Sequence, residues 1–341
     1  MPGSELIERA GVELETVLRS AEDDLFKYVF RVRNDLWIEA IDYTPSSRAE
    51  RWDICISTQS GCAVGCKFCG TGAAFIGSLT AEEIVAQVQI IIERQPDFDA
   101  RTSRSVRILF MSMGEPGLNV ANVVRSAESL WNLLPNSAII ISTVGIDNGS
   151  VDCFITLAKC HENLGLQFSI HSPLEEQRNQ LIPFHNKLSL GQIASKGRRF
   201  RAATGRAVRA NFILFDDWLD PPVQTRRIEA ILSTFSPEDF HINLSPLYST
   251  STGEKAACRR RDIRDLLDRI LRGHGYTVTT SKCAGLDVGG SCGQLWHVRA
   301  PLEKYGRRIG GPSQPRSGPR TQASAPDANS LVFMGPGPVT S

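Results

Sequence analysis

Three cysteines in one short segment carry the chemistry that this sequence shows most clearly. Cys62, Cys66 and Cys69 are spaced C-x3-C-x2-C in the run GCAVGCKFC at 61–69. Three thiolates in one loop can bind three irons of a cubane iron-sulfur cluster, which leaves the fourth iron open to a small molecule. The spacing therefore predicts a [4Fe-4S] cluster with one reactive iron.

A structural zinc ion is the alternative ligand for the same three thiols. Such a site closes with four ligands, often from a second Cys or His pair at short spacing. No second C-x2-C and no H-x3-H is present, and the remaining cysteines are scattered: Cys55, Cys153, Cys160, Cys258, Cys283 and Cys292. We therefore favour the cluster over zinc.

The segment around the three cysteines resembles a known family of enzymes. CISTQSGCAVGCKFCGTG at 55–72 is similar to the cluster loop of radical S-adenosylmethionine (SAM) enzymes, and more narrowly of the RlmN/Cfr RNA methyltransferases. Further similar stretches follow in the family's order: MSMGEPGLN at 111–119, IST at 141–143, FSIHSPLEEQRNQLIPFHNK at 168–187, INLSPL at 242–247 and SCGQL at 291–295. Matches in this order over about 250 residues are hard to obtain by chance.

Length and composition agree with a single catalytic domain. A chain of 341 residues with 41% hydrophobic content can bury a large core. Its net charge of +1 provides no global field toward nucleic acid, so RNA contacts would have to come from local patches. An odd number of cysteines, nine, without an apolar signal run favours a reducing cytoplasm. No stretch is long and apolar enough to span a membrane, and we expect a cytoplasmic monomer.

Extended apolar runs alternate with helical patterns along the chain. Strands are expected at 54–58, 107–112, 138–142, 166–171, 208–215 and 241–245, and helices from Thr80 onward and at 120–134, 189–203 and 225–234. Six strand-helix units imply parallel pairing with right-handed crossovers, hence an α/β fold, the radical SAM partial (βα)6 barrel. Barrels of this kind carry their chemistry at the carboxyl ends of the strands. The cysteine loop follows the first strand, as that rule requires.

The chain is expected to divide into three segments: an N-terminal extension, a catalytic core and a C-terminal tail. Residues 1–45 would form an N-terminal helix and a two-stranded extension, the strands lying within KYVFRVRNDLWIEAIDY at 27–43. Residues 46–300 would form the radical SAM core, which ends with a helix, a strand at 276–281 and the C-terminal loop with Cys292. Residues 301–341 are rich in Gly, Pro, Ser and Arg with little to bury, which predicts a disordered tail.

Gly114 and Glu115 follow the second expected strand. A glycine permits close backbone approach to a ligand, and a carboxylate can accept hydrogen bonds from the amino group of a cofactor. Gly-Glu-Pro is also a plain turn signal. The family resemblance implies that these two residues bind SAM.

The same resemblance implies further cofactor contacts from Ser142, after the third strand, and from Ser169, Ile170 and His171, at the end of the fourth. Without the resemblance, a lone histidine at a strand end is more often a packed core residue. One position departs from the family: an Asn that holds the SAM ribose after the sixth strand is replaced by Tyr248.

Two further cysteines point to a methylase. Cys292 matches the family residue that accepts a methyl group from one SAM, and Cys55 matches its resolving partner. By position alone, Cys55 would be a core residue of a buried strand, whereas Cys292 lies among glycines with little to pack against. A deprotonated thiol is a suitable nucleophile for a sulfonium methyl group.

The resemblance also implies an order of events. Cys292 takes a methyl group from a first SAM, and a second SAM on the cluster yields a 5'-deoxyadenosyl radical that removes a hydrogen from that methyl. The carbon radical adds to an electron-poor ring carbon of adenine, a base removes the ring proton, and Cys55 attacks the sulfur to form a disulfide with Cys292. A flavodoxin-type donor would supply electrons.

Glu39, in the run WIEAID at 37–42, resembles the family's base. Glu39 and Asp42 cannot face the same side of a strand, because side chains alternate and the separation is odd. A charged residue on a strand usually lies on the solvated face. With the resemblance we favour Glu39 over Asp42.

Three functions remain open. The first is an RNA adenine C-methyltransferase, although the segment before the first strand is shorter than the family's RNA-binding domain, and the polar residues near 75–79 and 282–287 differ. A basic stretch at 196–201, with Arg206 and Arg209 around Phe200, suits phosphates and base stacking, although such faces are more often merely solvated. The second is a methylase of the same mechanism that acts on a small molecule or peptide. The third is a non-catalytic iron-sulfur or redox-sensing protein, which would need neither Cys55, Cys292 nor Glu39.

Overall fold

The computed structural model describes residues 10–33, 36–247, 261–281 and 284–291. The chain divides into two units, 1–306 and 307–341, and every described residue lies in the first. Tyr248, Cys292 and the tail expected at 301–341 lie outside the described residues.

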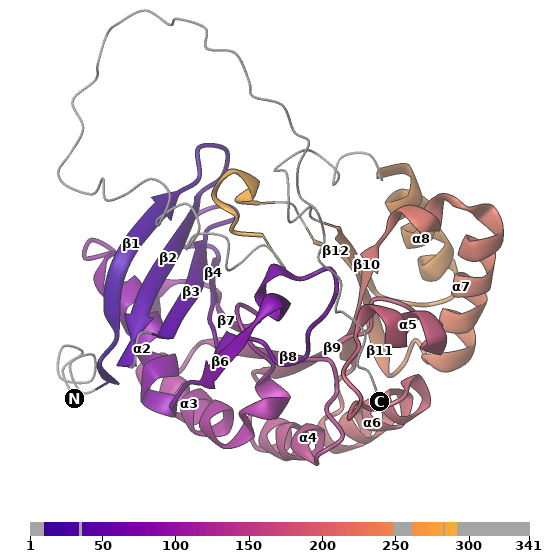
Figure 1. Cartoon of the computed structure of the whole chain (residues 1–341), viewed down its shortest axis with the longest axis horizontal. Helices are drawn as coiled ribbons and strands as arrows, with labels where there is room; N and C mark the ends of the chain where they lie inside the picture. The colour runs from indigo at the N-terminus through magenta and orange to yellow at the C-terminus, as the bar shows by residue number, and fades with distance from the viewer. Residues whose placement is uncertain (1–9, 34–35, 248–260, 282–283, 292–341) are drawn as a thin grey trace, which may run out of the picture. The chain divides into compact units, whose positions relative to one another are not determined.

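A ten-stranded sheet in the order β1-β2-β3-β4-β7-β8-β9-β10-β11-β12 organises the described chain. Its antiparallel part comprises β1 (Glu13–Arg19), β2 (Leu25–Val32) and β3 (Leu36–Tyr43), and β3 also pairs antiparallel with β4. The parallel part comprises β4 (Trp52–Cys55), β7 (Val106–Phe110), β8 (Ala138–Thr143), β9 (Leu164–Ser169), β10 (Val208–Leu214), β11 (Phe240–Pro246) and β12 (Val278–Thr280). The sheet curves with its strands inside and the helices outside (Figure 1).

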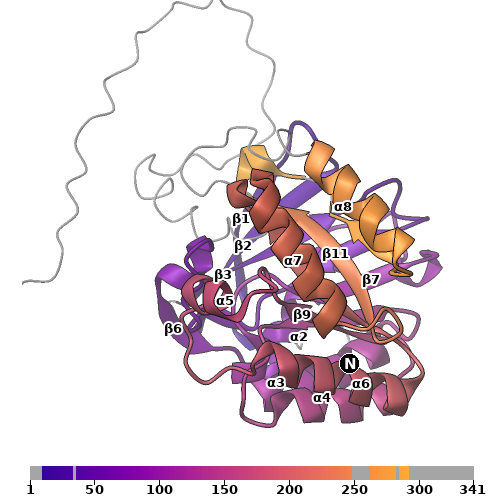
Figure 2. The same cartoon turned by 90° about the vertical axis from the view of Figure 1, so that its right-hand side faces the viewer.

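Helices cover the outer side of the curved sheet, as Figures 1 and 2 show from two directions. They are α2 (Ala81–Glu93), α3 (Val120–Leu133), α4 (Ser150–Cys160), α5 (Glu175–Leu181), α6 (Leu190–Thr204), α7 (Pro221–Thr234) and α8 (Arg261–Gly273). Helix α2 begins at the expected capping box, in which Thr80 and Glu83 bond reciprocally. Among the described residues, no helix combines the length and apolar character of a membrane span.

The parallel α/β core confirms the fold class expected from the sequence. The six expected strands are β4, β7, β8, β9, β10 and β11, and the strand expected at 276–281 adds β12 to the same parallel sheet. Helix α4 was not expected from the sequence. Its Val151, Ile155 and Thr156 are β-branched and have low intrinsic helix propensity. Burial of Phe154 and Leu157 outweighs that propensity.

The N-terminal extension differs from the expectation. It has three strands instead of two, because β1 pairs with β2 along the sheet edge, with a bulge between Leu14 and Thr16. Only Thr16 of β1 is buried, so the strand lacks the apolar alternation by which a sequence reveals a strand. Its charged residues suit an exposed edge. The helix expected before it falls largely outside the described residues.

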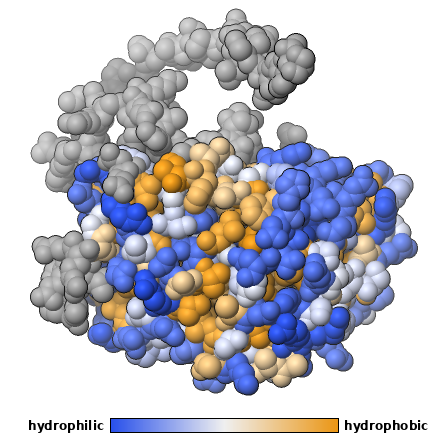
Figure 3. All heavy atoms as spheres, turned by 60° about the horizontal axis from the view of Figure 1, so that its bottom comes forward, coloured by the Kyte–Doolittle hydropathy of each residue, from blue (hydrophilic) through white to orange (hydrophobic). Residues whose placement is uncertain are grey.

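The surface of the helical layer is mixed. In Figure 3, apolar residues reach the surface in several places and are separated by polar ones. Among the described residues, the large apolar side chains that are exposed are Phe75, Ile76 and Leu219. Phe75 and Ile76 belong to the hairpin beside the cysteine loop, described below.

A buried carboxylate ties β4 to β7 inside the sheet. Asp53 Oδ2 lies 2.6 Å from Arg107 Nη2 and 2.7 Å from Arg51 Nη2. Burial alone would raise the pKa of Asp53, but the hydrogen bonds from Arg107 and Arg51 outweigh it, so the pKa is below its usual value.

We therefore expect Asp53→Asn to cost stability in a pH-dependent way. A carboxyl whose pKa is lowered on folding stabilises the protein above its unfolded pKa of about 3.9, and that stability is lost as pH falls through the folded value. Urea unfolding of both proteins between pH 7 and pH 2.5 measures the difference. A difference that stays constant down to the lowest pH would contradict the assignment.

Gly197 marks the closest approach of α6 to the sheet. A Cβ atom at Gly197 would lie 2.2 Å from Cζ of Phe240, a buried ring in β11. Gly191, also in α6, has no atom within 4 Å of the same position. Gly197→Ala should therefore lower the free energy of unfolding by about 1–3 kcal/mol through overpacking, whereas Gly191→Ala should be neutral or slightly stabilising. Urea denaturation compares the two, and equal effects would contradict the packing.

Candidate functional site: a three-thiol loop and a buried carboxylate

The three thiols lie in the loop between two short strands, β5 (Gln59–Gly61) and β6 (Phe75–Ser78). The antiparallel pairing of β5 with β6 closes the loop at its base. Cys62 N also donates a hydrogen bond to Ala74 O at 2.9 Å. Gly61 has φ +74°, and a Cβ atom there would lie 2.0 Å from Ala74 O, so only glycine fits this closure. The sequence did not reveal this hairpin.

Burial and mutual repulsion disfavour thiolates in this loop. Burial, together with the nearby Glu115 and Cys69, raises the pKa of Cys62 to about 12. Burial also raises the pKa of Cys66 well above its usual value, with Cys69 and Cys62 adding to the effect. Three thiolates can exist together here only if a cation compensates their charge. The donor set therefore fits an iron-sulfur cluster chemically.

The spread of the three thiols is compatible with a cluster. Among the described residues, no three His, Cys, Asp or Glu side chains converge closely enough to hold a single metal ion. In a cubane cluster each thiolate binds a different iron. Cluster ligands can therefore lie farther apart than the ligands of one zinc ion.

Apolar side chains surround the cysteine loop. Val64, Val144, Ile146 and Ile182 form a separate buried group, against which Cys62, Cys66 and Phe68 pack. Lys67 N donates to Leu181 O at 3.0 Å, which holds the loop against the end of α5. An apolar shell of this kind limits solvent access to a metal centre.

Gly114 and Glu115 lie in the turn that follows β7, which ends at Phe110. Gly114 has φ +99°, and a Cβ atom there would lie 2.7 Å from Thr58 Oγ1, so the turn requires glycine. Glu115 is buried, and its carboxylate accepts hydrogen bonds from Gly117 N at 2.8 Å, from Val144 N at 2.9 Å and from the Thr143 hydroxyl. Burial raises the pKa of Glu115, and the three hydrogen bonds only partly oppose this rise. The carboxylate therefore joins the ends of β7 and β8, a structural role that the sequence did not indicate, and its contact with SAM stays a prediction.

The other predicted cofactor residues meet at the same edge of the sheet. Ser142 Oγ, at the end of β8, lies 3.3 Å from Ser169 Oγ, at the end of β9. Ile170 is fully buried. His171 has φ +62°, a conformation rare for a residue other than glycine, and its ring packs edge-on against Phe68 of the cysteine loop, 4.8 Å between centroids.

His171 is neutral at physiological pH. Burial lowers the pKa of its imidazole to about 3, with a further contribution from Arg178. His171 Nδ1 has no hydrogen-bond partner among the described residues. A buried polar atom without a partner costs free energy, so this nitrogen fits a contact with a bound group. The SAM contact of His171 stays a prediction.

A row of polar side chains continues along the carboxyl ends of β10, β11 and β12, and the sequence interpretation missed it. Asn243 Nδ2 donates to Asn211 Oδ1 at 2.7 Å and to Ser281 Oγ at 3.0 Å, and Ser245 Oγ donates to Asn211 Oδ1 at 2.8 Å. The signal lay in polar residues alternating with apolar ones in the runs VRANFIL and FHINLSP. These groups extend the hydrogen-bonding surface beyond Ser142 and Ser169.

Glu39 and Cys55 face the same side of the sheet. In the antiparallel pair of β3 and β4, Ile41 lies opposite Cys55, and residues opposite one another share a face. Glu39 is two residues from Ile41 and therefore projects to that face as well. Asp42 projects to the other face, where it bonds to Arg48 Nη2 at 2.9 Å and Trp52 Nε1 at 2.6 Å. The register thus orients Glu39, and not Asp42, toward Cys55.

Part of the predicted basic surface of α6 is engaged within the fold, while Arg198 and Arg201 are exposed. Lys196 and Arg199 lie 2.8 and 2.9 Å from Asp152 Oδ1. Arg206 donates to the carbonyl oxygens of Ala158 and Leu164. Phe200 is buried in the core. The expectation that Phe200 stacks on a base is therefore wrong, because the helix turns this ring toward the sheet.

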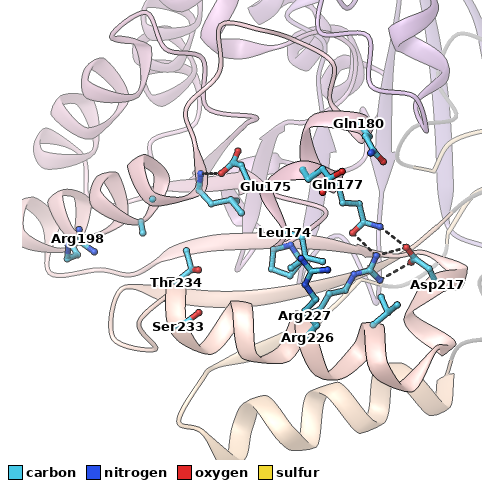
Figure 4. Close-up of a pocket in the computed structure, with 16 residues that line it drawn as sticks. Leu174, Glu175, Gln177, Gln180, Arg198, Asp217, Arg226, Arg227, Ser233 and Thr234 are labelled. Atoms are coloured by element: carbon cyan, nitrogen blue, oxygen red, sulfur yellow. Dashed lines mark hydrogen bonds and ion pairs between the residues drawn. The ribbon is translucent and has the colours of Figure 1, made fainter.

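A groove of about 930 Å³ lies elsewhere, between α5, α6 and α7. Its wall contains Arg227, which is 2.5 Å from Asp217 Oδ2 and donates to Gln177 Oε1 at 2.6 Å (Figure 4). None of its lining residues belongs to the cysteine loop or to the polar row. Its carboxylates and guanidiniums are mixed, so it does not select one charge of ligand.

Comparison with known proteins identifies the class of protein to which this fold and site belong. The chain matches no protein-family profile. Its fold is similar to that of a radical SAM methyltransferase from Sphaerobacter thermophilus, with a TM-score of 0.67 and 26% identity over 85% of this chain and 84% of that one. Fold and site together define a radical SAM methyltransferase.

Sequence relatives identify the family within this class of methyltransferases. The probable dual-specificity RNA methyltransferase RlmN of Synechocystis sp. is 33% identical over 278 residues, which is 81% of this chain and 75% of the relative. The ribosomal RNA large subunit methyltransferase N of Nitrosopumilus maritimus is 30% identical over 285 residues, 81% and 78% of the two chains. This chain belongs to the RlmN family of RNA methyltransferases. Membership favours an enzyme over the non-catalytic iron-sulfur protein considered above.

The site predicts a specific loss of iron. Cys62→Ala, Cys66→Ala and Cys69→Ala should each lower iron and acid-labile sulfide to a small fraction of the wild-type content after anaerobic reconstitution, because three thiolates are needed to hold a cubane. Cys153→Ala removes an exposed thiol of α4 and should leave the metal content unchanged. Equal iron in all four variants would contradict the assignment.

Proposed function

We propose that this protein methylates a ring carbon of adenine in RNA, with Cys292 as the carrier of the methyl group and two SAM molecules consumed per turnover. The observation that carries the proposal is the combination of the three-thiol loop with Glu39 and Cys55 on one face of the sheet, in a chain of the RlmN family. Cluster binding alone would require neither Glu39 nor Cys55.

Cys62, Cys66 and Cys69 would hold a [4Fe-4S] cluster, and Gly114, Glu115, Ser142, Ser169, Ile170 and His171 would surround SAM. When bound, the cluster and SAM supply the one-electron chemistry that activates an unreactive C–H bond. The chain supplies binding groups at the carboxyl edge of the sheet, including the serine pair of β8 and β9. The apolar shell of the loop would keep water from the site.

Two cysteines account for the transfer and release of the methyl carbon. The Cys292 thiolate displaces the methyl group from the sulfonium, so a sulfur–carbon bond forms and S-adenosylhomocysteine leaves. After that carbon is joined to adenine, the Cys55 thiolate attacks the Cys292 sulfur. A disulfide forms, the sulfur–carbon bond breaks, and its electron pair stays on the carbon, which takes a proton. A thiol reductant, as found in a reducing cytoplasm, restores both thiols.

Glu39 would act as the base that removes the proton from the ring carbon, and the unpaired electron left on the ring adduct would return to the iron-sulfur cluster that supplied it. It is buried at 5% exposure and lies on the face of Cys55. A general base must come within hydrogen-bonding reach of the proton that it takes. The substrate would be single-stranded or flipped out of a helix, because a ring carbon is hidden in stacked bases.

The proposal is tested by anaerobic incubation of the reconstituted protein with SAM, a flavodoxin-type or chemical reductant, and ribosomal RNA, transfer RNA or free adenosine. Digestion and mass spectrometry should reveal methyladenosine from one of the RNAs, and its retention time distinguishes carbon 2 from carbon 8. Product from adenosine alone would favour the small-molecule methylase. No methylated nucleoside from any RNA would overturn the proposal.

Cys55→Ala should trap the RNA on the protein. Without a resolving thiol, the sulfur–carbon bond between Cys292 and the base cannot be broken, so we expect a covalent RNA-protein adduct and at least a hundredfold less free product. Cys160→Ala, which removes an exposed thiol of α4, is the matched control. Multiple turnover by Cys55→Ala would refute the resolving role.

A further inference from the structure

Lys27 is a fully buried lysine that the reaction described above does not use. It lies in β2 opposite Ile41 of β3 and therefore shares a face with Glu39. Its Nζ is 2.8 Å from Glu39 Oε2 and donates to Gly289 O at 3.0 Å. Apart from this ion pair, Glu39 Oε2 has no partner in the described part of the chain. One ammonium group thus contacts the proposed base and a segment 262 residues further along the chain.

The segment 284–291 is docked on the N-terminal sheet by further contacts. Asp287 accepts hydrogen bonds from Ser20 Oγ at 2.8 Å and from Ala21 N at 2.7 Å, and Gly285 N donates to Asp23 Oδ2 at 2.8 Å. A Cβ atom at Gly285 would lie 2.7 Å from Leu25. In Figure 1 the segment lies beside the ends of β1 and β2. Among these contacts, only the one from Lys27 also reaches the site.

Stability alone does not explain a charged pair in this place. Burial lowers the pKa of Lys27, and Glu39 opposes that effect. Two well-packed apolar residues are often as stabilising as a buried ion pair, because the ions lose their hydration. What an ion pair adds is direction: the ammonium has three donors, which can be shared between a carboxylate and a carbonyl oxygen.

We propose that Lys27 is a positioning residue, which holds the Glu39 carboxylate and the segment 284–291 in one arrangement, so that the base keeps a fixed position relative to the residues that precede Cys292 in the chain. The part of this inference that concerns catalysis rests on the proposed function. Cys292 follows Ser291 directly, and Glu39 comes from a different part of the chain. Proton removal by Glu39 must precede attack by Cys55, so a displaced carboxylate would leave the adduct unresolved.

The contact between Lys27 and the segment 284–291 is tested by a measurement that does not depend on catalysis. Glu39→Gln keeps the contact from Lys27 to Gly289, whereas the double variant Lys27→Met/Glu39→Gln removes it and leaves no unpaired buried charge. Hydrogen exchange at Gly290 N, which donates to Gly285 O at 2.8 Å, should be roughly tenfold faster in the double variant, since a hydrogen bond from a charged donor is lost. Arg107→Met, which breaks the pair with Asp53 instead, should leave this amide unchanged. Equal exchange in the Glu39→Gln and double variants would overturn the tether.

The catalytic half is tested by single turnover with Lys27→Met and Asp287→Ala. Lys27→Met should still methylate Cys292 but accumulate the covalent RNA adduct, with at least tenfold slower release of product. A merely destabilised protein would lose both steps together. Asp287→Ala loosens the same segment with Lys27 and Glu39 intact, and it too should slow product release. Faster exchange with unchanged product release in both variants would overturn the coupling, while a wild type without product would refute the proposed function and leave the exchange result standing.

Discussion

The antiparallel pairing of β3 with β4 is the constraint on which the site depends. This pairing joins a three-stranded antiparallel extension to a parallel sheet, and its register places Ile41 opposite Cys55. Because side chains alternate along a strand, a shift by one residue would turn Glu39 outward and bring Asp42 inward. The extension is therefore an integral wall of the site.

The parallel strands add a second constraint, since their carboxyl ends meet at one edge. The cysteine loop, the Gly114 turn, the serine pair and His171 all follow strand ends at that edge. Their backbones are held in unusual forms, with positive φ at Gly61, Gly114 and His171. Such conformations persist where surrounding contacts hold them. Here the buried Glu115 carboxylate and the apolar shell of the loop supply those contacts.

Several charged side chains of this protein are paired inside the fold. Lys196 and Arg199 of α6 bind Asp152, and Arg206 of the following turn binds backbone carbonyl groups, whereas Arg198 and Arg201 are exposed. Phosphate contacts generally set affinity without reading sequence. The exposed Phe75 and Ile76 flank the cysteine loop.

Spacing and apolar periodicity are local properties, so the three-thiol loop, the parallel strands and the residues at their ends could be predicted from the amino-acid sequence. Which of these residues share one site depends on how the strands pair. No local pattern distinguishes Lys27 from an exposed lysine, because its partners Glu39 and Gly289 lie 12 and 262 positions away along the chain. The edge strand β1 pairs with the neighbouring strand β2 and was missed because it lacks apolar alternation. The helix α4 and the buried ring of Phe200 were missed or misread for the same reason as Lys27. Each owes its state to a partner distant in sequence, and no local pattern records such a partner.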